Sequence, residues 1–179
     1  CRHGKYNLCE ELKVMGFQTT GTASEFFAVD AKKVTPIPKS MSFEEGAMLE
    51  PLAVAVHAVR QMGDVTGMNI AVLGAGTIGK LVAPAAKGLG AAKVMLTDVS
   101  DHRLEKAKEC GVDVCVNTKG KNFGEALIEA FGRDKADVIY DCAGNNVTRG
   151  QAIQYARKGS VIVLVAVFAD MATVDLAVA

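Results

Sequence analysis

The sequence predicts an α/β fold built on a doubly wound parallel sheet. Short apolar segments alternate with amphipathic helical segments over residues 69–167, and this alternation is typical of parallel strands joined by helical crossovers. One of the apolar segments closes on Gly74-x-Gly76-x-x-Gly79 and opens into helix-compatible sequence. The next apolar segment ends at Asp98, 19 residues after Gly79.

The glycines and Asp98 together indicate a dinucleotide-binding turn in a Rossmann-like sheet. Gly74 allows a tight turn, Gly76 lets the backbone approach a pyrophosphate, and Gly79 lets the helix pack closely on the strand. Asp98 lies where a carboxylate would accept a hydrogen bond from an adenosine ribose 2′-hydroxyl and repel a 2′-phosphate, which favours NAD over NADP. The alternatives are an ordinary glycine loop and a solvated acid at a strand end.

The periodicity predicts five strands and four helices in this region. Strands are expected near 69–74, 93–98, 113–117, 137–142 and 160–167, and helices near 77–89, 101–110, 122–131 and 146–157. Ser100 is expected to cap the second of these helices and Gly111 to follow its end, whereas Pro84 is expected to kink the first or to force a local rearrangement. Too little sequence follows residue 167 for the sixth strand of a complete dinucleotide fold.

The first fifty residues have a different character. Residues 24–29 and 33–38 predict short strands at the edge of a β-domain. The capping box at 42–45 predicts the start of a helix. Pro51 predicts a break in that helix, which would leave Glu50 at the junction of two helices.

The composition of the chain limits the kinds of binding partner and the cellular location that we expect. Half of the 179 residues are apolar, 22% are charged and the formal charges cancel, so nucleic acid and anionic membrane surfaces are not expected partners. The longest apolar run, 161–169, is too short to cross a bilayer, and no signal peptide opens the chain. The five cysteines do not form a disulfide-dense framework. We expect a soluble cytoplasmic protein, and its start at Cys1 indicates a fragment.

Two of the cysteines, Cys1 and Cys9, flank a polar segment that contains glycine. Two thiolates do not complete a tetrahedral zinc site, and a fourth ligand is missing even with His3. Two free cysteines are therefore the simpler interpretation within this chain.

Taken together, these motifs resemble the medium-chain, zinc-dependent alcohol dehydrogenase family, and within it the sorbitol (polyol) dehydrogenase branch. The resemblance covers essentially the whole chain, and its marks are Cys1-x7-Cys9 and the segments 42–52, 72–79 and 97–104. It implies a two-domain enzyme with zinc in a GroES-like β catalytic domain and NAD in a Rossmann domain. Residues 1–50 would be the end of the first domain, and 51–179 an incomplete second.

The resemblance also implies roles for single residues. Glu50 matches the position from which polyol dehydrogenases direct a carboxylate toward the catalytic zinc or its bound water, although an ordinary helix-terminal acid is the alternative. Cys1 and Cys9 would be the last two of four thiolates in a structural zinc lobe. The other catalytic ligands, a cysteine and a histidine–glutamate pair, would lie upstream of Cys1.

For NAD, the resemblance implies contacts along the whole cofactor. The pyrophosphate would be held at the glycine turn, the adenosine would lie beside an acid and an arginine, and the loops after the fourth and fifth strands would contact the adenosine side and the nicotinamide. In that order the residues are Gly74, Gly76, Thr77, Ile78 and Gly79, then Asp98 and Arg103, then Cys142 and Ala143, and finally Val165 and Val167.

The implied reaction is oxidation of a secondary alcohol, a polyol of the sorbitol or xylitol type, to a ketone with hydride transfer to NAD; zinc would polarise the alcohol oxygen. Threonine or butanediol dehydrogenases of the same family are alternatives, as is a stand-alone NAD-binding module. The chain alone is expected to bind cofactor without turnover. Residues 171–176 resemble the edge strand that pairs sheets across a two-fold axis, so a homo-oligomer, a dimer or tetramer, is expected.

Overall fold

A computed structural model describes residues 4–168, 171, 173–175 and 177 of the chain. The chain separates into two compact units, Cys1–Ser42 and Phe43–Ala179, and each is described by itself. Among the described residues no helix is both long enough and apolar enough to span a bilayer.

The first unit contains little regular structure. It has two single 3-10 turns, η1 (Tyr6–Leu8) and η2 (Ala31–Lys33), and an isolated bridge between Met15 and Thr19. None of its described residues is buried. The predicted strands at 24–29 and 33–38 are wrong, because a strand needs a neighbour for its backbone amides and neither segment pairs with one in the described part of this unit.

The second unit begins with α1 (Phe43–Arg60), which starts where the capping box predicts. The helix continues through Pro51, so the expected break and the place of Glu50 at a helix end are wrong. A proline within a helix removes one hydrogen bond, but the long ladder on either side remains, and Ala55 and Val59 are fully buried against the sheet. The division expected between residues 50 and 51 therefore falls inside a continuous helix.

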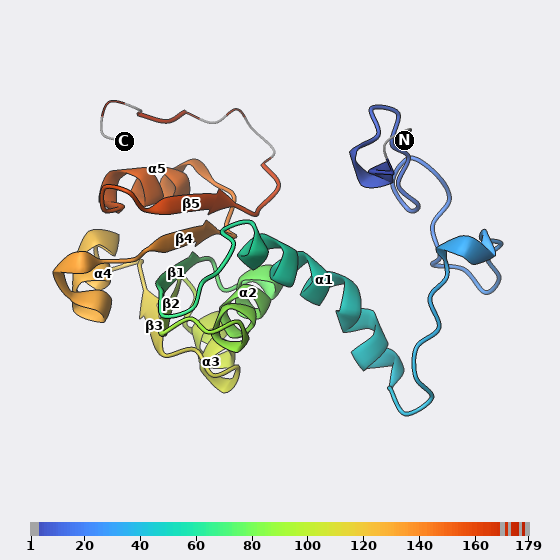
Figure 1. The fold of residues 1–179 in the computed structure, drawn as a ribbon, viewed down its shortest axis with the longest axis horizontal. Coiled ribbons are helices and arrows are strands. Elements are labelled where there is room, and N and C mark those ends of the chain that lie inside the picture. Colours follow the sequence, from blue (N-terminus) through green and yellow to red (C-terminus); the bar gives the residue numbers. More distant parts are fainter. Residues whose placement is uncertain (1–3, 169–170, 172, 176, 178–179) are drawn as a thin grey trace. The chain divides into compact units, whose positions relative to one another are not determined.

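The sheet has five parallel strands in the order β3-β2-β1-β4-β5 (Figure 1). The strands are β1 (Asn69–Leu73), β2 (Lys93–Asp98), β3 (Val114–Asn117), β4 (Val138–Asp141) and β5 (Val161–Leu164). The connecting helices are α2 (Thr77–Gly88), α3 (Asp101–Glu109), α4 (Phe123–Phe131) and α5 (Asn146–Tyr155), with a short η3 (Gly132–Asp134) before β4. The predicted Rossmann-like parallel sheet is confirmed, although β5 is shorter than expected.

Helices cover both faces of this sheet. Alternate strand residues point to opposite sides: Ile70 and Val72 pack with α1, α2 and α3, whereas Ala71 and Leu73 pack with α4 and α5. Figure 1 shows the two groups of helices on either side of the strands. Burial on both faces explains why the central strands read as nearly continuous apolar segments.

Local signals within the sequence set the ends of the helices. Ser100 caps α3, accepting a hydrogen bond from the Arg103 amide at 3.5 Å, and Gly111 follows the helix with a φ of +78°. Both features are as predicted. Pro84 lies within α2, which continues without interruption from Thr77 to Gly88.

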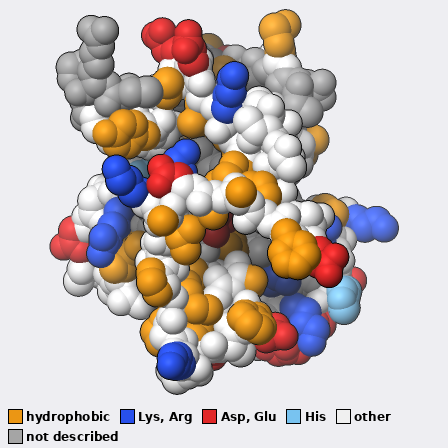
Figure 2. Space-filling view, turned by 90° about the vertical axis from the view of Figure 1, so that its right-hand side faces the viewer, with side chains coloured by type: hydrophobic (Ala, Val, Ile, Leu, Met, Phe, Trp, Pro, Cys, Tyr) orange, Lys and Arg blue, Asp and Glu red, His pale blue; other side chains and the backbone are white. Residues whose placement is uncertain are grey.

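On the face shown in Figure 2, acidic and basic side chains are interspersed among hydrophobic ones, in keeping with the zero net charge.

Candidate functional site

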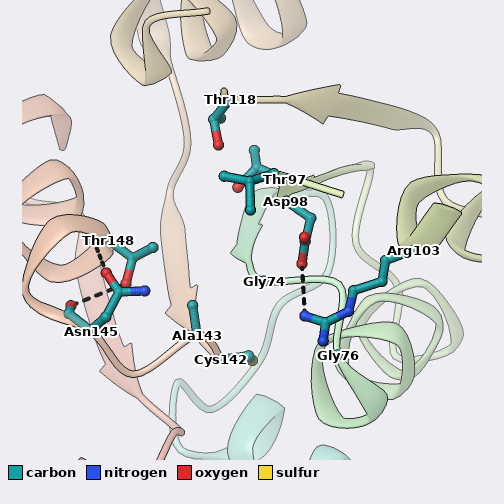
Figure 3. A pocket seen from close by; sticks show the side chains of 11 residues that line it. Gly74, Gly76, Thr97, Asp98, Arg103, Thr118, Cys142, Ala143, Asn145 and Thr148 are labelled. Atoms are coloured by element: carbon teal, nitrogen blue, oxygen red, sulfur yellow. Dashed lines mark hydrogen bonds and ion pairs between the residues drawn. The ribbon is translucent and has the colours of Figure 1, made fainter. Parts of the chain in front are cut away.

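A pocket lies at the carboxyl ends of the strands, where the strand order changes direction. From β1 the chain crosses to β2 and β3 on one side, and β4 and β5 lie on the other, and such a switch point is the usual ligand crevice of open α/β sheets. The pocket is lined by Gly74, Gly76, Thr97, Asp98, Val99, Arg103, Thr118, Cys142, Ala143, Asn145 and Thr148 (Figure 3).

The turn between β1 and α2 depends on glycine at two positions. Gly74 has a φ of +98°, a conformation that side-chain-bearing residues rarely adopt. A Cβ atom at Gly79 would lie only 1.8 Å from the Gly74 carbonyl oxygen, so the first turn of α2 packs directly on the preceding loop. At Gly76, by contrast, a Cβ would meet no atom within 4 Å. The backbone of Gly76 is therefore open to an approaching ligand.

The start of α2 is suited to bind an anion. Gly76 is the N-cap residue, no side chain caps the helix, and the first turn contains no acidic residue. The amides of a first helical turn lack partners within the helix, and the helix dipole adds positive potential there. A phosphate group is a suitable acceptor for these amides.

Asp98 is a buried, fixed carboxylate on the β2 side of the pocket. Its side chain accepts hydrogen bonds from the Ala75 amide at 2.7 Å and from the Ser100 amide at 2.9 Å. Arg103 lies beside it, with 3.8 Å between the guanidinium and the carboxylate (Figure 3). Asp98 is 8% exposed, so it is not a solvated strand-end acid. Because each carboxylate oxygen has more than one acceptor position, a ligand hydroxyl can still bind.

The β4 side of the pocket is formed by the loop after the strand and the start of α5. Asn145 caps α5 by accepting a hydrogen bond from the Thr148 amide at 2.9 Å. Burial, and secondarily the nearby Asp141 charge, raise the pKa of the Cys142 thiol to about 12. Cys142 is therefore a neutral thiol at physiological pH, and its part in the pocket is one of shape.

Comparison with known proteins identifies the family. Residues 77–179 match the family model described as zinc-binding dehydrogenase. Human sorbitol dehydrogenase is 35% identical and L-idonate 5-dehydrogenase from Vitis vinifera 36% identical, and each match covers 98% of this chain and 50% of the relative. The chain belongs to the zinc-binding dehydrogenase family. It spans about half the length of the curated relatives that it matches.

Solved structures of dehydrogenases share the fold. A zinc-binding dehydrogenase from Sinorhizobium meliloti, described as bound to NADP, superposes with a TM-score of 0.91 at 28% identity, covering 99% of this chain and 53% of its own. An Escherichia coli dehydrogenase complexed with NADH gives 0.88 at 31% identity, covering 99% and 52%. Galactitol-1-phosphate dehydrogenase from Escherichia coli gives 0.87 at 28% identity, covering 99% and 51%.

Not all residues expected to bind cofactor line the pocket. Gly74, Gly76, Asp98, Arg103, Cys142 and Ala143 do. Thr77, Ile78 and Gly79 form the first turn of α2 beside it. Val165 and Val167 follow β5 without lining the pocket, and Val167 is 97% exposed. The sequence predicted a strand as far as residue 167, whereas β5 ends at Leu164, so the positions of Val165 and Val167 were not predicted.

The residues expected to ligate zinc do not make a complete metal site among the described residues. Glu50 is an exposed residue of α1, Cys9 lies in the first unit, and Cys1 is outside the described residues. No group of three or more His, Cys, Asp or Glu side chains among the described residues is placed to hold a metal ion. The residues present therefore do not fit a complete zinc site.

Three residues of the β4 side were not identified from the sequence: Asp141, Asn145 and Thr148. Asn145 and Thr148 line the pocket. Asp141 does not line it, but its carboxylate accepts hydrogen bonds from the Ala143 amide and the Thr148 hydroxyl. The sequence contains a signal for these residues. Asp141 ends the apolar strand, and Asn145 precedes Thr148 by three positions, which is the spacing of a helix N-cap.

Proposed function

We propose that this chain is the NAD-binding portion of a zinc-dependent polyol dehydrogenase, which oxidises a secondary alcohol of the sorbitol or xylitol type to a ketone. The observation that carries the proposal is the juxtaposition of an uncapped helix start with a buried acid in one pocket. Gly76, at the N-terminus of α2, and Asp98, at the end of β2, both line it. These are the two groups that a dinucleotide needs for its pyrophosphate and its adenosine ribose.

In this proposal the first turn of α2 holds the pyrophosphate, with the amides of Thr77, Ile78 and Gly79 facing it. Asp98 binds the 2′-hydroxyl of the adenosine ribose, and Arg103 lies beside the ribose or the adenine. The solved relatives include one bound to NADP and one bound to NADH, so the preference has to come from the site itself. A buried carboxylate favours NAD, because it would be forced against the 2′-phosphate of NADP.

The nicotinamide half would then lie toward the end of β5. Cys142 and Ala143 line the pocket, and we propose them for the adenosine side of the cofactor and the backbone near Val165 and Val167 for nicotinamide contacts. NAD supplies the hydride acceptor, and the part of this chain is to bind and orient it.

Zinc and substrate are assigned to the whole protein. We propose Glu50 as the residue that faces the catalytic zinc or its water, and Cys1 and Cys9 as members of a structural zinc site whose other ligands lie elsewhere. Alone, the chain should bind cofactor without oxidising alcohols. We further propose a small-molecule substrate, a cytoplasmic location and a dimeric or tetrameric assembly.

Threonine or a vicinal diol is the alternative substrate. L-Threonine 3-dehydrogenase from Symbiobacterium thermophilum is 33% identical over 99% of this chain, and butanediol dehydrogenase from Bacillus subtilis superposes with a TM-score of 0.85. A substrate panel on the longer enzyme decides between them. A strong preference for a primary alcohol would contradict both.

The test of cofactor binding is a calorimetric titration of the chain with NADH and with NADPH. Asp98→Asn keeps the size of the side chain and removes its charge, so NADH should bind about tenfold more weakly or worse and the preference over NADPH should shrink. Asp113→Asn is the control, because Asp113 also accepts a backbone amide, from Val94, outside the pocket. Unchanged selectivity in Asp98→Asn would remove that residue from the role.

Two further measurements on the same preparation test the rest of the proposal. Metal analysis should find no tightly bound stoichiometric zinc, and sorbitol or xylitol with NAD should give no turnover. Zinc-dependent polyol oxidation by the isolated chain would show that its own residues complete the site. Failure of the wild-type chain to bind NADH would refute the cofactor assignment.

A further inference from the structure

Asp141, the last residue of β4, is bonded to the segments on one side of the pocket without lining it. Its Oδ1 accepts hydrogen bonds from the amides of Ala143 at 3.1 Å and Gly144 at 3.3 Å, and the Thr148 hydroxyl lies 3.1 Å away. Its backbone carbonyl accepts hydrogen bonds from the Val165 and Ala166 amides, both at 3.0 Å. One residue therefore joins the loop after β4, the start of α5 and the segment after β5.

These segments are also packed tightly against one another. Gly144 has a φ of +71°, and a Cβ added to it would lie 2.7 Å from the Ala166 Cβ. A Cβ added to Gly74 would lie 3.0 Å from the Ala143 Cβ. A shift of the loop after β4 would therefore be transmitted to the turn after β1 and to the chain after β5.

The bonding of Asp141 is not what stability alone would favour. The residue is fully buried, and its second carboxylate oxygen, Oδ2, has no hydrogen-bond partner among the described residues. Burying a carboxylate is costly unless it is fully satisfied. A buried, under-satisfied polar group of this kind calls for an explanation beyond packing.

We propose that Asp141 is a positioning residue for the nicotinamide half of the dinucleotide. This inference rests on the proposed function. Asp141 makes no contact with the cofactor. Its carboxylate fixes Gly144, which packs against Ala166, and its carbonyl binds the Val165 amide, so it holds the backbone that we assign to the nicotinamide side. The adenosine half lies across the pocket beside Asp98, where the loop is held by other bonds, to Ala75 and Ser100.

The two halves of the cofactor therefore provide a readout that a merely structural role would not give. ADP contains the adenosine ribose and the pyrophosphate and lacks the nicotinamide, whereas NADH contains all three. Loss of the Asp141 carboxylate should weaken NADH binding more than ADP binding, because Asp98 and the start of α2 are also held by bonds that do not involve Asp141. A general loss of folding would weaken both ligands in the same proportion.

The experiment measures NADH and ADP affinities by calorimetry, with thermal unfolding, for the wild type, Asp141→Ala and Asp141→Asn. Asp141→Ala removes all three side-chain interactions and should weaken NADH about tenfold, several-fold more than it weakens ADP. Asp141→Asn retains an acceptor oxygen and should show a smaller change in the same direction. If the alanine variant does not fold, the asparagine variant supplies the test.

Asp137→Asn is the matched control, because Asp137 has the corresponding bonds just before the opposite end of β4. Its carboxylate accepts a hydrogen bond from the Asn69 amide at 2.7 Å and pairs with Arg157, and its carbonyl accepts one from the Val161 amide at 3.0 Å. This variant should lower the thermal midpoint and leave the ratio of NADH to ADP affinity unchanged.

Two results would overturn the inference: NADH and ADP affinities that fall equally in the Asp141 variants, or NADH and ADP affinities that both stay at the wild-type values. Both leave the proposed function intact, since the wild type still binds NADH. If the wild-type chain binds neither ligand, the proposed function fails first and takes this inference with it.

Discussion

Substitutions at two glycines of the same turn should separate effects on stability from effects on cofactor binding: Gly79 is expected to affect mainly stability, and Gly76 mainly cofactor affinity. A Cβ at Gly79 would lie 1.8 Å from the Gly74 oxygen and 3.0 Å from the Gly74 carbonyl carbon. Both are backbone atoms, so no side chain can rotate away, and the start of α2 or the preceding turn has to move. Overpacking of this kind costs about 1–3 kcal/mol or more, whereas replacing glycine by alanine within a helix returns about 1 kcal/mol.

Gly79→Ala should therefore destabilise the chain by about 2 kcal/mol, taking the upper part of the overpacking range because the overlap is with backbone. For a protein of this size that corresponds to a thermal midpoint lower by roughly 4–8 °C. Gly76→Ala should cost less than about 1 kcal/mol. A Cβ there meets no atom within 4 Å, and the φ of −70° suits any residue.

Gly76→Ala should have a large effect on cofactor affinity although its effect on stability is small. Its methyl group would occupy the space through which the pyrophosphate approaches the start of α2, so NADH should bind at least about tenfold more weakly. Thermal unfolding and NADH titration on both variants measure the two effects. Wild-type NADH affinity in Gly76→Ala would refute phosphate binding at this helix end, and wild-type stability in Gly79→Ala would refute the packing argument.

Two other predictions concern alkaline stability and assembly. The pKa of Cys142 is raised from 9.0 to about 12, chiefly by burial and secondarily by Asp141, so the unfolded chain releases this proton first and stability is lost as the pH rises from about 9 toward 12. Cys142→Ser should reduce that slope in alkaline denaturation. Burial also raises the pKa of Tyr140 to about 12 and raises that of Cys115, and these two groups contribute to the slope that remains. An unchanged slope contradicts the assignment. Sedimentation should show a dimer, since β5 is a sheet edge with Leu164 half exposed, and a monomer at high concentration would count against it.

The sheet was predictable because its signals are local and mutually consistent. Central strands buried on both faces give continuous apolar segments, and Ser100 and Gly111 mark the ends of α3 as capping residues do. The errors arose where structure depends on distant partners. The segments at 24–29 and 33–38 have strand-like composition without a paired neighbour in the described unit. At Pro51 the burial of α1 outweighed a local breaker.

Prediction of the candidate site followed the same division. Gly74, Gly76 and Asp98 belong to a spaced motif and were found, and they line one pocket. The structural part of Asp98, which bonds the turn at Ala75 to Ser100, was not foreseen because it requires three-dimensional proximity. The expected strand 171–176 lies partly outside the described residues, and residues 171 and 173–175 are not in a strand.

Helix α1 connects this pocket to the residue proposed for the metal. Its C-terminal half is fixed to the sheet by the burial of Ala55 and Val59 and by the Tyr140 hydroxyl, which donates to the Val59 carbonyl at 3.2 Å. Glu50 precedes Val59 by nine residues, or about 14 Å along the helix axis. Tyr140 directly precedes Asp141 in β4, so one strand end holds both the pocket loop and the helix that bears Glu50. In the proposed enzyme, the rigidity of α1 would thus relate the position of the carboxylate to that of the nicotinamide.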